Sequence, residues 1–238
     1  MKKILFLLLF SGLSMMVFAQ KQFVVDANAE IRSVNESFNA IVVSGGIDIY
    51  ISQSDREELA ISASDDRYKE GIKTIVTNKV LKVYYDGDKS WSSKNKNLKA
   101  YISFKELERL EATGASDIII AGEVKVPSLL IKLTGASDLK GILKVNTLIV
   151  NLSGASDARI SGTANEATID CSGASDVKGF EMVIDKCTAK ASGASDINIT
   201  VNKELNANAS GASDIYFRGA AVILSQQSSG ASTVSRKK

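Results

Sequence analysis

The sequence contains no histidine, and this absence removes several kinds of active site. Serine or cysteine nucleophiles paired with a histidine base are excluded, as are the usual zinc sites, which draw on histidine ligands. An excess of one charge is also lacking, since 29 Lys and Arg stand against 27 Asp and Glu. A net charge of +2 gives no electrostatic footprint for nucleic acid, so we expect no nucleic-acid partner. We also expect no cofactor.

Long apolar runs are absent after the first twenty residues, so no later segment is expected to cross a bilayer. The first stretch, MKKILFLLLFSGLSMMVFAQ, has two lysines, an apolar run to Phe18, and small residues at Val17 and Ala19. This pattern predicts a signal peptide over residues 1–19, whereas the run is short for a membrane anchor. We therefore expect export to the periplasm, the outer-membrane surface or the extracellular space.

One tetrad, Gly-Ala-Ser-Asp, occurs six times, and a seventh copy ends in Ser-Thr. Successive copies start 18 to 21 residues apart, and a fixed period near 20 residues is typical of solenoid repeats. The stretch VVSGGIDIYIS at residues 42–52 follows the same pattern further upstream. The predicted corner glycines are Gly45, Gly114, Gly135, Gly154, Gly173, Gly193, Gly211 and Gly230.

Apolar residues alternate with polar ones on both sides of each tetrad. In the third copy, Leu148, Val150 and Leu152 precede the glycine at every second position, and Ala158 follows the tetrad. A period of two is that of a strand with one face turned inward. Each repeat is therefore predicted to contain a strand, a tight corner, a second strand and a looser turn, such as Ser161–Glu166.

Matching inward residues in every copy favour strands that stack in register. No segment between copies has the period of a helix, so units that alternate strand and helix are excluded. The sequence predicts an all-β fold, a parallel β-helix or β-solenoid with right-handed coils about 4.8 Å apart. An antiparallel meander is the alternative, but it would reverse every second copy and give no reason for identical corners.

The N-terminal part is expected to be less regular than the rest. We assign residues 20–104 to this part and residues 105–238 to the regular repeats, continuous with it. The register is expected to start near Phe38 and to be lost between Ser52 and Lys105. The elements expected in the gap are a helical turn at Asp65–Gly71, a hairpin around Asn78 and Lys79, a polar loop at Asp86–Asn97 and a strand over residues 98–104.

The inward positions of the last copy turn polar, as the capping coil of a solenoid requires. These positions are Leu224, Gln226 and Ser228.

Two cysteines, Cys171 and Cys187, fall at inward positions. Cys187 is predicted to stack over Ala167, which lies about 13 Å along the strand from Cys171. This separation is too long for a disulfide. We therefore expect two buried free thiols, although exported proteins often pair their cysteines.

The sequence resembles the head GIN domain family of auto-transporter adhesins, a family of exported proteins in Bacteroidetes-type bacteria. The resemblance rests on FNAIVVSGGIDIYISQ, on VLKVYYDG followed by AYISF, and on the repeated GASDI. It covers the chain from Phe38 onward. It implies an all-β, solenoid-like fold and a surface or periplasmic location.

The tetrad has a structural interpretation that needs no ligand. Glycine adopts positive φ without strain, alanine is small enough to be buried in a tight bend, and serine and aspartate bond to nearby backbone N–H groups. The competing interpretation is a calcium ladder, because a cation would relieve repulsion between carboxylates in adjacent coils. The candidate ligands are Asp117, Asp138, Asp157, Asp176, Asp196 and Asp214.

Two further functions compete with a purely structural repeat. Parallel β-helices include polysaccharide-degrading enzymes that use paired carboxylates, but here every coil carries the same aspartate and the repeats hold few aromatics, so no catalytic residue is assigned. A binding loop is the other candidate, since Trp91 lies among Lys89 and Lys94 in a polar segment. The sequence thus predicts an exported, non-enzymatic adhesion module for a surface glycan or protein, with self-association possible.

Overall fold

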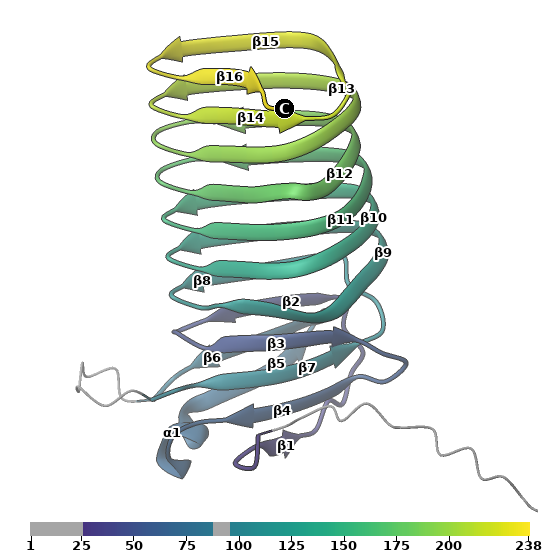
Figure 1. The fold of residues 1–238 in the computed structure, drawn as a ribbon. Coiled ribbons are helices and arrows are strands. Elements are labelled where there is room, and N and C mark those ends of the chain that lie inside the picture. Colours follow the sequence, from purple (N-terminus) through teal and green to yellow (C-terminus); the bar gives the residue numbers. More distant parts are fainter. Residues whose placement is uncertain (1–25, 88–95) are drawn as a thin grey trace, which may run out of the picture.

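The computed structural model describes residues 26–87 and 96–238, and the predicted signal peptide lies outside these ranges. The chain forms a parallel β-solenoid of about seven turns, so the predicted fold class is confirmed (Figure 1). No helix in the described ranges is long and apolar enough to span a membrane. The elements of the N-terminal part are β1 (Glu30–Arg32), β2 (Ala40–Ser44), β3 (Asp48–Gln53), β4 (Glu58–Ser62), α1 (Asp66–Gly71), β5 (Ile72–Thr77), β6 (Val80–Tyr85) and β7 (Lys99–Phe104).

The regular repeats continue the same sheet toward the C-terminus. Their strands are β8 (Arg109–Gly114), β9 (Ile118–Gly135), β10 (Asp138–Gly154), β11 (Asp157–Cys171), β12 (Asp176–Ala191), β13 (Asp196–Gly211), β14 (Asp214–Arg218), β15 (Val222–Gly230) and β16 (Thr233–Arg236). Neighbouring coils pair in parallel, and equivalent residues stand in register, as Asp138 does with Asp157 and Leu152 with Cys171.

Each coil of the regular region folds back at one sharp corner and bends only gently elsewhere. The expected turn at residues 161–166 is wrong, because these residues lie inside the continuous strand β11. In β10 the inward alternation changes phase where Asn146 and Thr147 are both exposed. Two consecutive outward residues thus mark a bend at Asn146, which the ladders to β9 and β11 both skip before they resume at Thr147.

The stack extends into the region where the sequence period disappears. Strands β6 and β7 form a coil below β2 and β3, because β2 pairs in parallel with both β6 and β8 and β3 with both β7 and β9. The β2–β3 coil therefore precedes the β6–β7 coil in sequence but lies between it and the regular repeats (Figure 1). The expected hairpin is confirmed as β5–β6, with positive φ at Asn78 and Lys79, and the helical turn is confirmed as α1.

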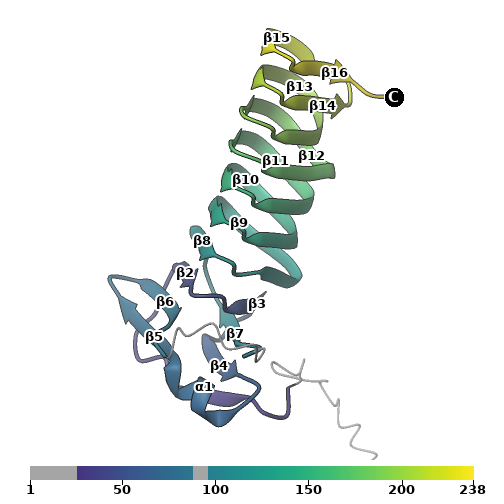
Figure 2. The same ribbon diagram turned by 90° about the vertical axis from the view of Figure 1, so that its left-hand side faces the viewer.

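The two ends of the solenoid differ. At the N-terminal end, β4 pairs antiparallel with β7, and β1 pairs antiparallel with β4; α1 lies at this same end (Figure 2). At the other end, β15 is exposed along its whole length. Gln226 and Ser228 stand over Ala207 and Ala209, as the expected polar cap requires, but the inward placement of Leu224 is wrong because the register shifts there and leaves its side chain 58% exposed.

The core fills the inside of the coils with aliphatic side chains from inward positions. Both cysteines belong to this core and are unpaired. Cys187 stands next to Ala167 and Cys171 next to Ala191, as the repeat alignment predicted. Burial raises the pKa of both thiols to about 12.

Candidate functional site

The tetrad forms the sharp corner of every regular coil, with its glycine in the left-handed region. All eight corner glycines have φ between +76° and +89°. In six of these corners, the N–H of the alanine after the glycine donates to the glycine carbonyl of the preceding coil, as Ala155 does to Gly135 at 2.7 Å. Because the alanine side chains are exposed, the expectation that a buried alanine fills the bend is wrong.

Serine is the buried residue of the corner. The six tetrad serines have no exposed surface. Ser156 shows their bonding: its hydroxyl donates to the carbonyl of Ser153 at 3.1 Å and accepts the backbone N–H of Ser137 at 3.4 Å. Inward-facing hydroxyls thus satisfy backbone groups that the corner would otherwise bury without partners. The six residues are Ser116, Ser137, Ser156, Ser175, Ser195 and Ser213.

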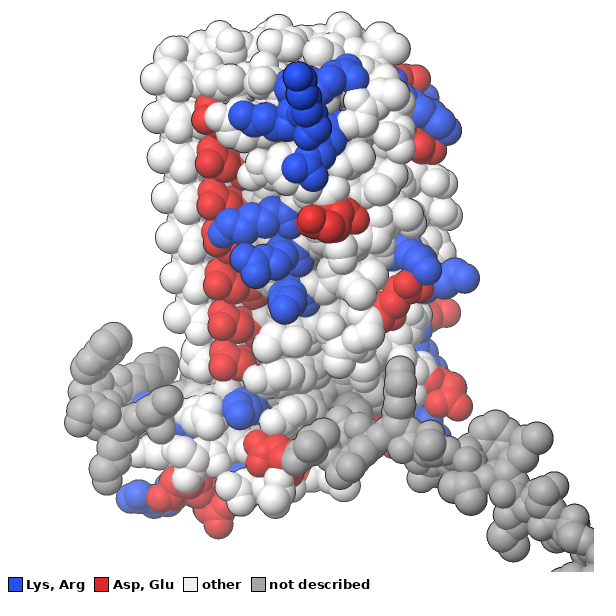
Figure 3. All heavy atoms as spheres, in the orientation of Figure 1, with Lys and Arg blue, Asp and Glu red and all other residues white. Residues whose placement is uncertain are grey.

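The tetrad aspartates form a column on the outer face of the corner, visible as the red stripe in Figure 3. Their carboxylates cap the next coil: the backbone N–H of Asp157 donates to Asp138 at 3.3 Å, and that of Asp196 donates to Asp176 at 3.3 Å. At the end of the column, Thr233 donates its N–H to Asp214 at 2.9 Å. The aspartates therefore bond to backbone in the adjacent coil, as the structural interpretation of the tetrad requires.

The charges along the column differ in their environment. Desolvation, then repulsion from a neighbouring aspartate, raises the pKa of Asp117, Asp138 and Asp196 above the usual range. By contrast, the hydroxyl of Tyr216 donates to Asp214 at 2.7 Å, and this bond holds the pKa of Asp214 below its usual range. Asp117, Asp138 and Asp196 are therefore each disfavoured by the charge of a neighbouring aspartate, whereas hydrogen bonds favour the ionised form of Asp214 at the C-terminal end.

Cations stand beside the aspartates in three successive coils. Lys140, Arg159 and Lys178 are in register two residues after the aspartates. Figure 3 shows blue side chains beside the red stripe. Lys178 bridges Asp157 at 2.5 Å and Asp176 at 3.7 Å. A shallow pocket of about 230 Å³ lies between the two columns. Lys178 therefore supplies part of the charge compensation that a calcium ion would otherwise provide.

The aspartates of the column are not arranged to surround a cation. Within residues 26–87 and 96–238, no group of three or more Asp, Glu, Cys or His side chains is arranged to hold a metal ion. Each coil contributes one carboxylate, and one of its oxygens is used on the next coil's backbone in several coils. Ca²⁺ prefers six to eight oxygen ligands, which this spacing does not supply.

The predicted binding residues Lys89, Trp91 and Lys94 lie outside the described ranges. The flanks of their segment show where it is attached. Tyr84 pairs with Ser44 just before the Gly45 corner, and Lys99 pairs with Asp48 just after it. The end of β6 and the start of β7 therefore flank the position next to the Gly45 corner in the adjacent coil.

Sequence reasoning missed a pocket at the N-terminal end of the solenoid. We call it the tyrosine pocket and define it by Asp26, Asn28, Tyr50, Lys99 and Tyr101. It has a volume of about 730 Å³. Its residues come from the N-terminal segment and from β3 and β7, which are far apart in sequence. The only signal in the sequence was the clustering of tyrosines before residue 105.

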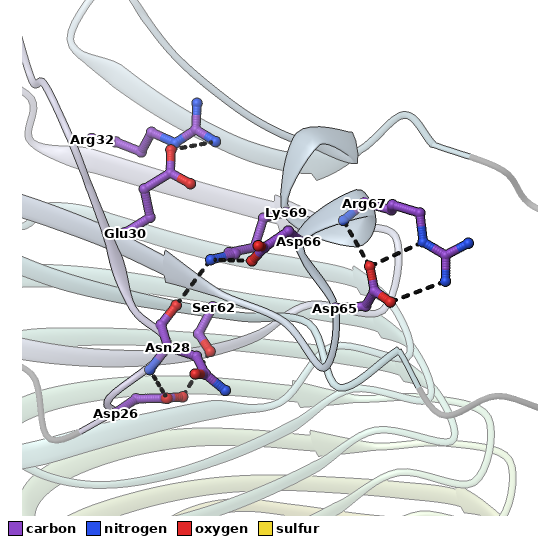
Figure 4. Close-up of polar contacts among 9 residues, drawn as sticks. All are labelled: Asp26, Asn28, Glu30, Arg32, Ser62, Asp65, Asp66, Arg67 and Lys69. Carbon is purple, nitrogen blue, oxygen red and sulfur yellow. Dashed lines mark hydrogen bonds and ion pairs between the residues drawn. The ribbon is translucent and has the colours of Figure 1, made fainter.

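The polar groups of this pocket are held by a small network. One oxygen of the Asp26 carboxylate accepts the hydroxyl of Ser62 at 2.7 Å, and the other accepts the N–H of Asn28 at 2.9 Å (Figure 4). The first oxygen also accepts the hydroxyl of Tyr101 at 3.1 Å. These bonds lower the pKa of Asp26. Desolvation, then the bond to Asp26, raises the pKa of Tyr101 to about 12. The carboxylate is therefore ionised, and Tyr101 stays a hydrogen-bond donor.

The family of the chain follows from comparison with known proteins. The family model described as "Putative auto-transporter adhesin, head GIN domain" matches residues 37–221, so the chain belongs to this family. None of the curated proteins matches it.

Solved structures share the fold. A putative adhesin from Bacteroides fragilis is 22% identical with a TM-score of 0.79, over 89% of this chain and 98% of its own. A putative adhesin from Parabacteroides merdae is 19% identical with a TM-score of 0.69, over 88% and 95%. A putative lipid binding protein from Parabacteroides distasonis is 22% identical with a TM-score of 0.66, over 90% and 98%. At these identities the likeness concerns the fold alone.

Proposed function

We propose that this member of the head GIN domain family is an exported, non-enzymatic adhesion module of the cell envelope, which binds a surface glycan or protein through the N-terminal end of its solenoid. The observation that carries the proposal is where the repeat is interrupted. The regular coils are filled by their own side chains, whereas at the N-terminal end the β6–β7 coil has no tetrad and the tyrosine pocket opens. Irregular segments on a rigid scaffold are where binding residues concentrate.

An enzyme of the β-helix type has less support. A catalytic carboxylate pair needs one environment that differs from all others. The aspartates of the column instead repeat one arrangement, in which the carboxylate of one coil faces the backbone of the next. The family is also described as an adhesin.

Export is tested by the N-terminus of the protein recovered from cells. We expect it to begin at Gln20 in the periplasmic, surface or secreted fraction, because residues 1–19 carry the signal-peptide pattern. A cytoplasmic protein that still begins at Met1 would contradict export.

Binding is tested on a glycan array and by pull-down from envelope extracts with the purified protein. We expect binding of the captured ligand to be lost or weakened at least about tenfold by Trp91→Ala, because tryptophan is enriched among the residues that dominate binding energy. Lys132→Ala is the matched control, since Lys132 is an exposed residue of the regular coils. Equal loss in both variants, or binding by neither the wild type nor the variants, would contradict the proposal. The same samples give the oligomeric state by light scattering.

A further inference from the structure

We infer that the tyrosine pocket binds a pyranose saccharide. This inference names a ligand class for the adhesion module and therefore rests on the proposed function. The pocket combines aromatic rings, a fixed carboxylate and uncommitted hydrogen-bonding groups in one concave site. A pyranose presents the matching chemistry, because it has an apolar face of C–H groups and a rim of hydroxyls that both donate and accept.

The aromatic part of the site is a rigid pair. The rings of Tyr50 and Tyr101 stack with centroids 5.2 Å apart and an angle of 21° between their planes. Both side chains are half-buried, so they line the pocket without closing it. They come from β3 and β7, which are paired in register at these two residues. A ring surface held by two paired strands needs little ordering on binding, which favours affinity.

The hydrogen-bond acceptor of the pocket, the Asp26 carboxylate, is held in place as firmly as the two tyrosine rings. The three bonds to Asp26 come from Ser62, Tyr101 and Asn28, so its carboxylate is ionised and cannot rotate freely. Each carboxylate oxygen can accept more than one hydrogen bond. The oxygen that accepts only the Asn28 N–H retains capacity for a ligand hydroxyl, and a bond from a hydroxyl to an ionised carboxylate is among the stronger ones.

The remaining polar groups are available to a ligand. Among the residues that the structure describes, the hydroxyl of Tyr50, the side-chain amide of Asn28 and the ammonium of Lys99 have no hydrogen-bond partner. They line the same pocket as the Asp26 carboxylate. Together they offer donors and acceptors around one ring-sized space, as recognition of adjacent sugar hydroxyls requires.

The size of the pocket suits this class of ligand. Its volume of about 730 Å³ lies within the range of about 300–1,000 Å³ that small-molecule sites occupy. Its mixture of aromatic and polar lining is unlike the continuous apolar wall that a lipid chain needs. We therefore assign the pocket to one or two sugar rings at the end of a glycan.

The test uses the purified full-length solenoid and a panel of free sugars: glucose, galactose, mannose, N-acetylglucosamine and glucuronic acid. Saturation-transfer NMR reports contact with the protein, and titration gives Kd. We expect at least one sugar to receive saturation mainly on the C–H groups of one ring face, with a Kd in the millimolar range or tighter. Glycerol, a polyol without a ring face, is expected to receive none.

Two variants separate binding from the structural role of Asp26. Tyr50→Leu removes one ring and one hydroxyl, and Asn28→Ala removes an amide, but neither side chain takes part in the bonds to Asp26. We expect each to weaken the bound sugar, Tyr50→Leu by about tenfold or more. Tyr84→Leu is the matched control, because Tyr84 is a half-buried tyrosine of β6 outside the pocket, and it should bind as the wild type does.

Each outcome decides the inference. Saturation of no sugar in the panel, or equal affinity in wild type and Tyr50→Leu with unchanged melting temperature, overturns it. Equal weakening by Tyr84→Leu would also overturn it, since the effect would then not belong to the pocket. If sugars fail to bind while array or pull-down capture persists and depends on Trp91, only the saccharide assignment falls, and the adhesion proposal stands.

Discussion

The carbonyl oxygen of Gly135 lies where it excludes any side chain on Gly154 in the next coil. A Cβ added to Gly154 would stand 2.4 Å from that oxygen, and the residue also has φ of +85°. The carbonyl is already bonded to the N–H of Ala155. Glycine is thus required at the corner both by its backbone conformation and by the close approach of the neighbouring coil.

This double requirement predicts the effect of Gly154→Ala. We expect it to lower the free energy of unfolding by more than about 3 kcal/mol, because it adds a backbone clash to the strain of positive φ. Gly122→Ala is the matched control: Gly122 has φ of +91°, but a Cβ there would meet nothing within 4 Å. It should cost only about 1–2 kcal/mol in denaturant unfolding. Equal losses of unfolding free energy in Gly154→Ala and Gly122→Ala would show that the clash with the neighbouring coil contributes nothing.

The buried serine of the corner predicts a second difference within one tetrad. Ser156→Ala removes the acceptor of the Ser137 N–H and the donor to Ser153, so we expect a loss of about 1–2 kcal/mol in unfolding free energy. Ala155→Ser adds a hydroxyl to the exposed neighbour and should change stability by less than about 0.5 kcal/mol. The opposite ranking would mean that the hydroxyl ladder is not a stabilising feature.

The repeat made much of the fold predictable from sequence. Period-two alternation gave the inward faces, and the common spacing gave the parallel register, including the neighbours of Cys171 and Cys187. The expected backbone bonding of serine is confirmed, whereas the expected burial of alanine is wrong because it rested on residue size alone. Hydrogen bonding decides which residue of the tetrad is buried. The backbone groups of the corner need partners inside the coil, and a serine hydroxyl provides them whereas an alanine side chain cannot.

The N-terminal end of the solenoid was less predictable, because the spatial order of its coils depends on tertiary contacts. The β6–β7 coil has no tetrad, and it lies below the β2–β3 coil although it follows it in sequence. No local sequence pattern indicates that the spatial order of the two coils differs from their order along the chain. The tyrosine pocket could not be found for the same reason, since Asp26, Tyr50 and Tyr101 meet only through this pairing.

The cysteines give a prediction for chemical modification. Both thiols are buried, with the pKa raised to about 12 by desolvation, so little thiolate exists at pH 8. We expect iodoacetamide to modify neither Cys171 nor Cys187 in the folded protein and both after unfolding without reductant. Mass spectrometry counts the adducts. An unfolded protein that gains none would require a disulfide and a different register.

The arrangement of the aspartate column predicts that calcium does not stabilise the solenoid. Lys178 bridges two of the aspartates, and backbone N–H groups use carboxylate oxygens elsewhere. We expect the melting temperature to be the same in millimolar CaCl₂ and in EDTA, with MgCl₂ as the ionic-strength control. A rise with calcium alone would show that the column holds an ion.

Opposite pKa shifts along the column predict opposite effects of neutralising two aspartates. The pKa of Asp138 is raised by desolvation and then by Asp117, so its ionised form disfavours the folded state. Asp138→Asn should therefore melt at the same temperature as the wild type or higher at pH 7, while keeping an oxygen for the Asp157 N–H. As pH falls through the raised pKa toward 3.8, the wild type regains this stability and the difference disappears.

Asp214 is the matched opposite case. Its pKa is lowered by the hydroxyl of Tyr216 and by Thr233, so ionisation contributes stability that is present above the unfolded value of 3.8. Asp214→Asn should therefore lower the melting temperature at pH 7, and the difference should shrink as pH falls through the lowered pKa. Melting curves of both variants and the wild type between pH 2 and 7 check the two signs. Destabilisation of equal size by both substitutions at pH 7 would contradict the repulsion assigned to Asp138, because of these two residues only Asp214 gains stability from its charge.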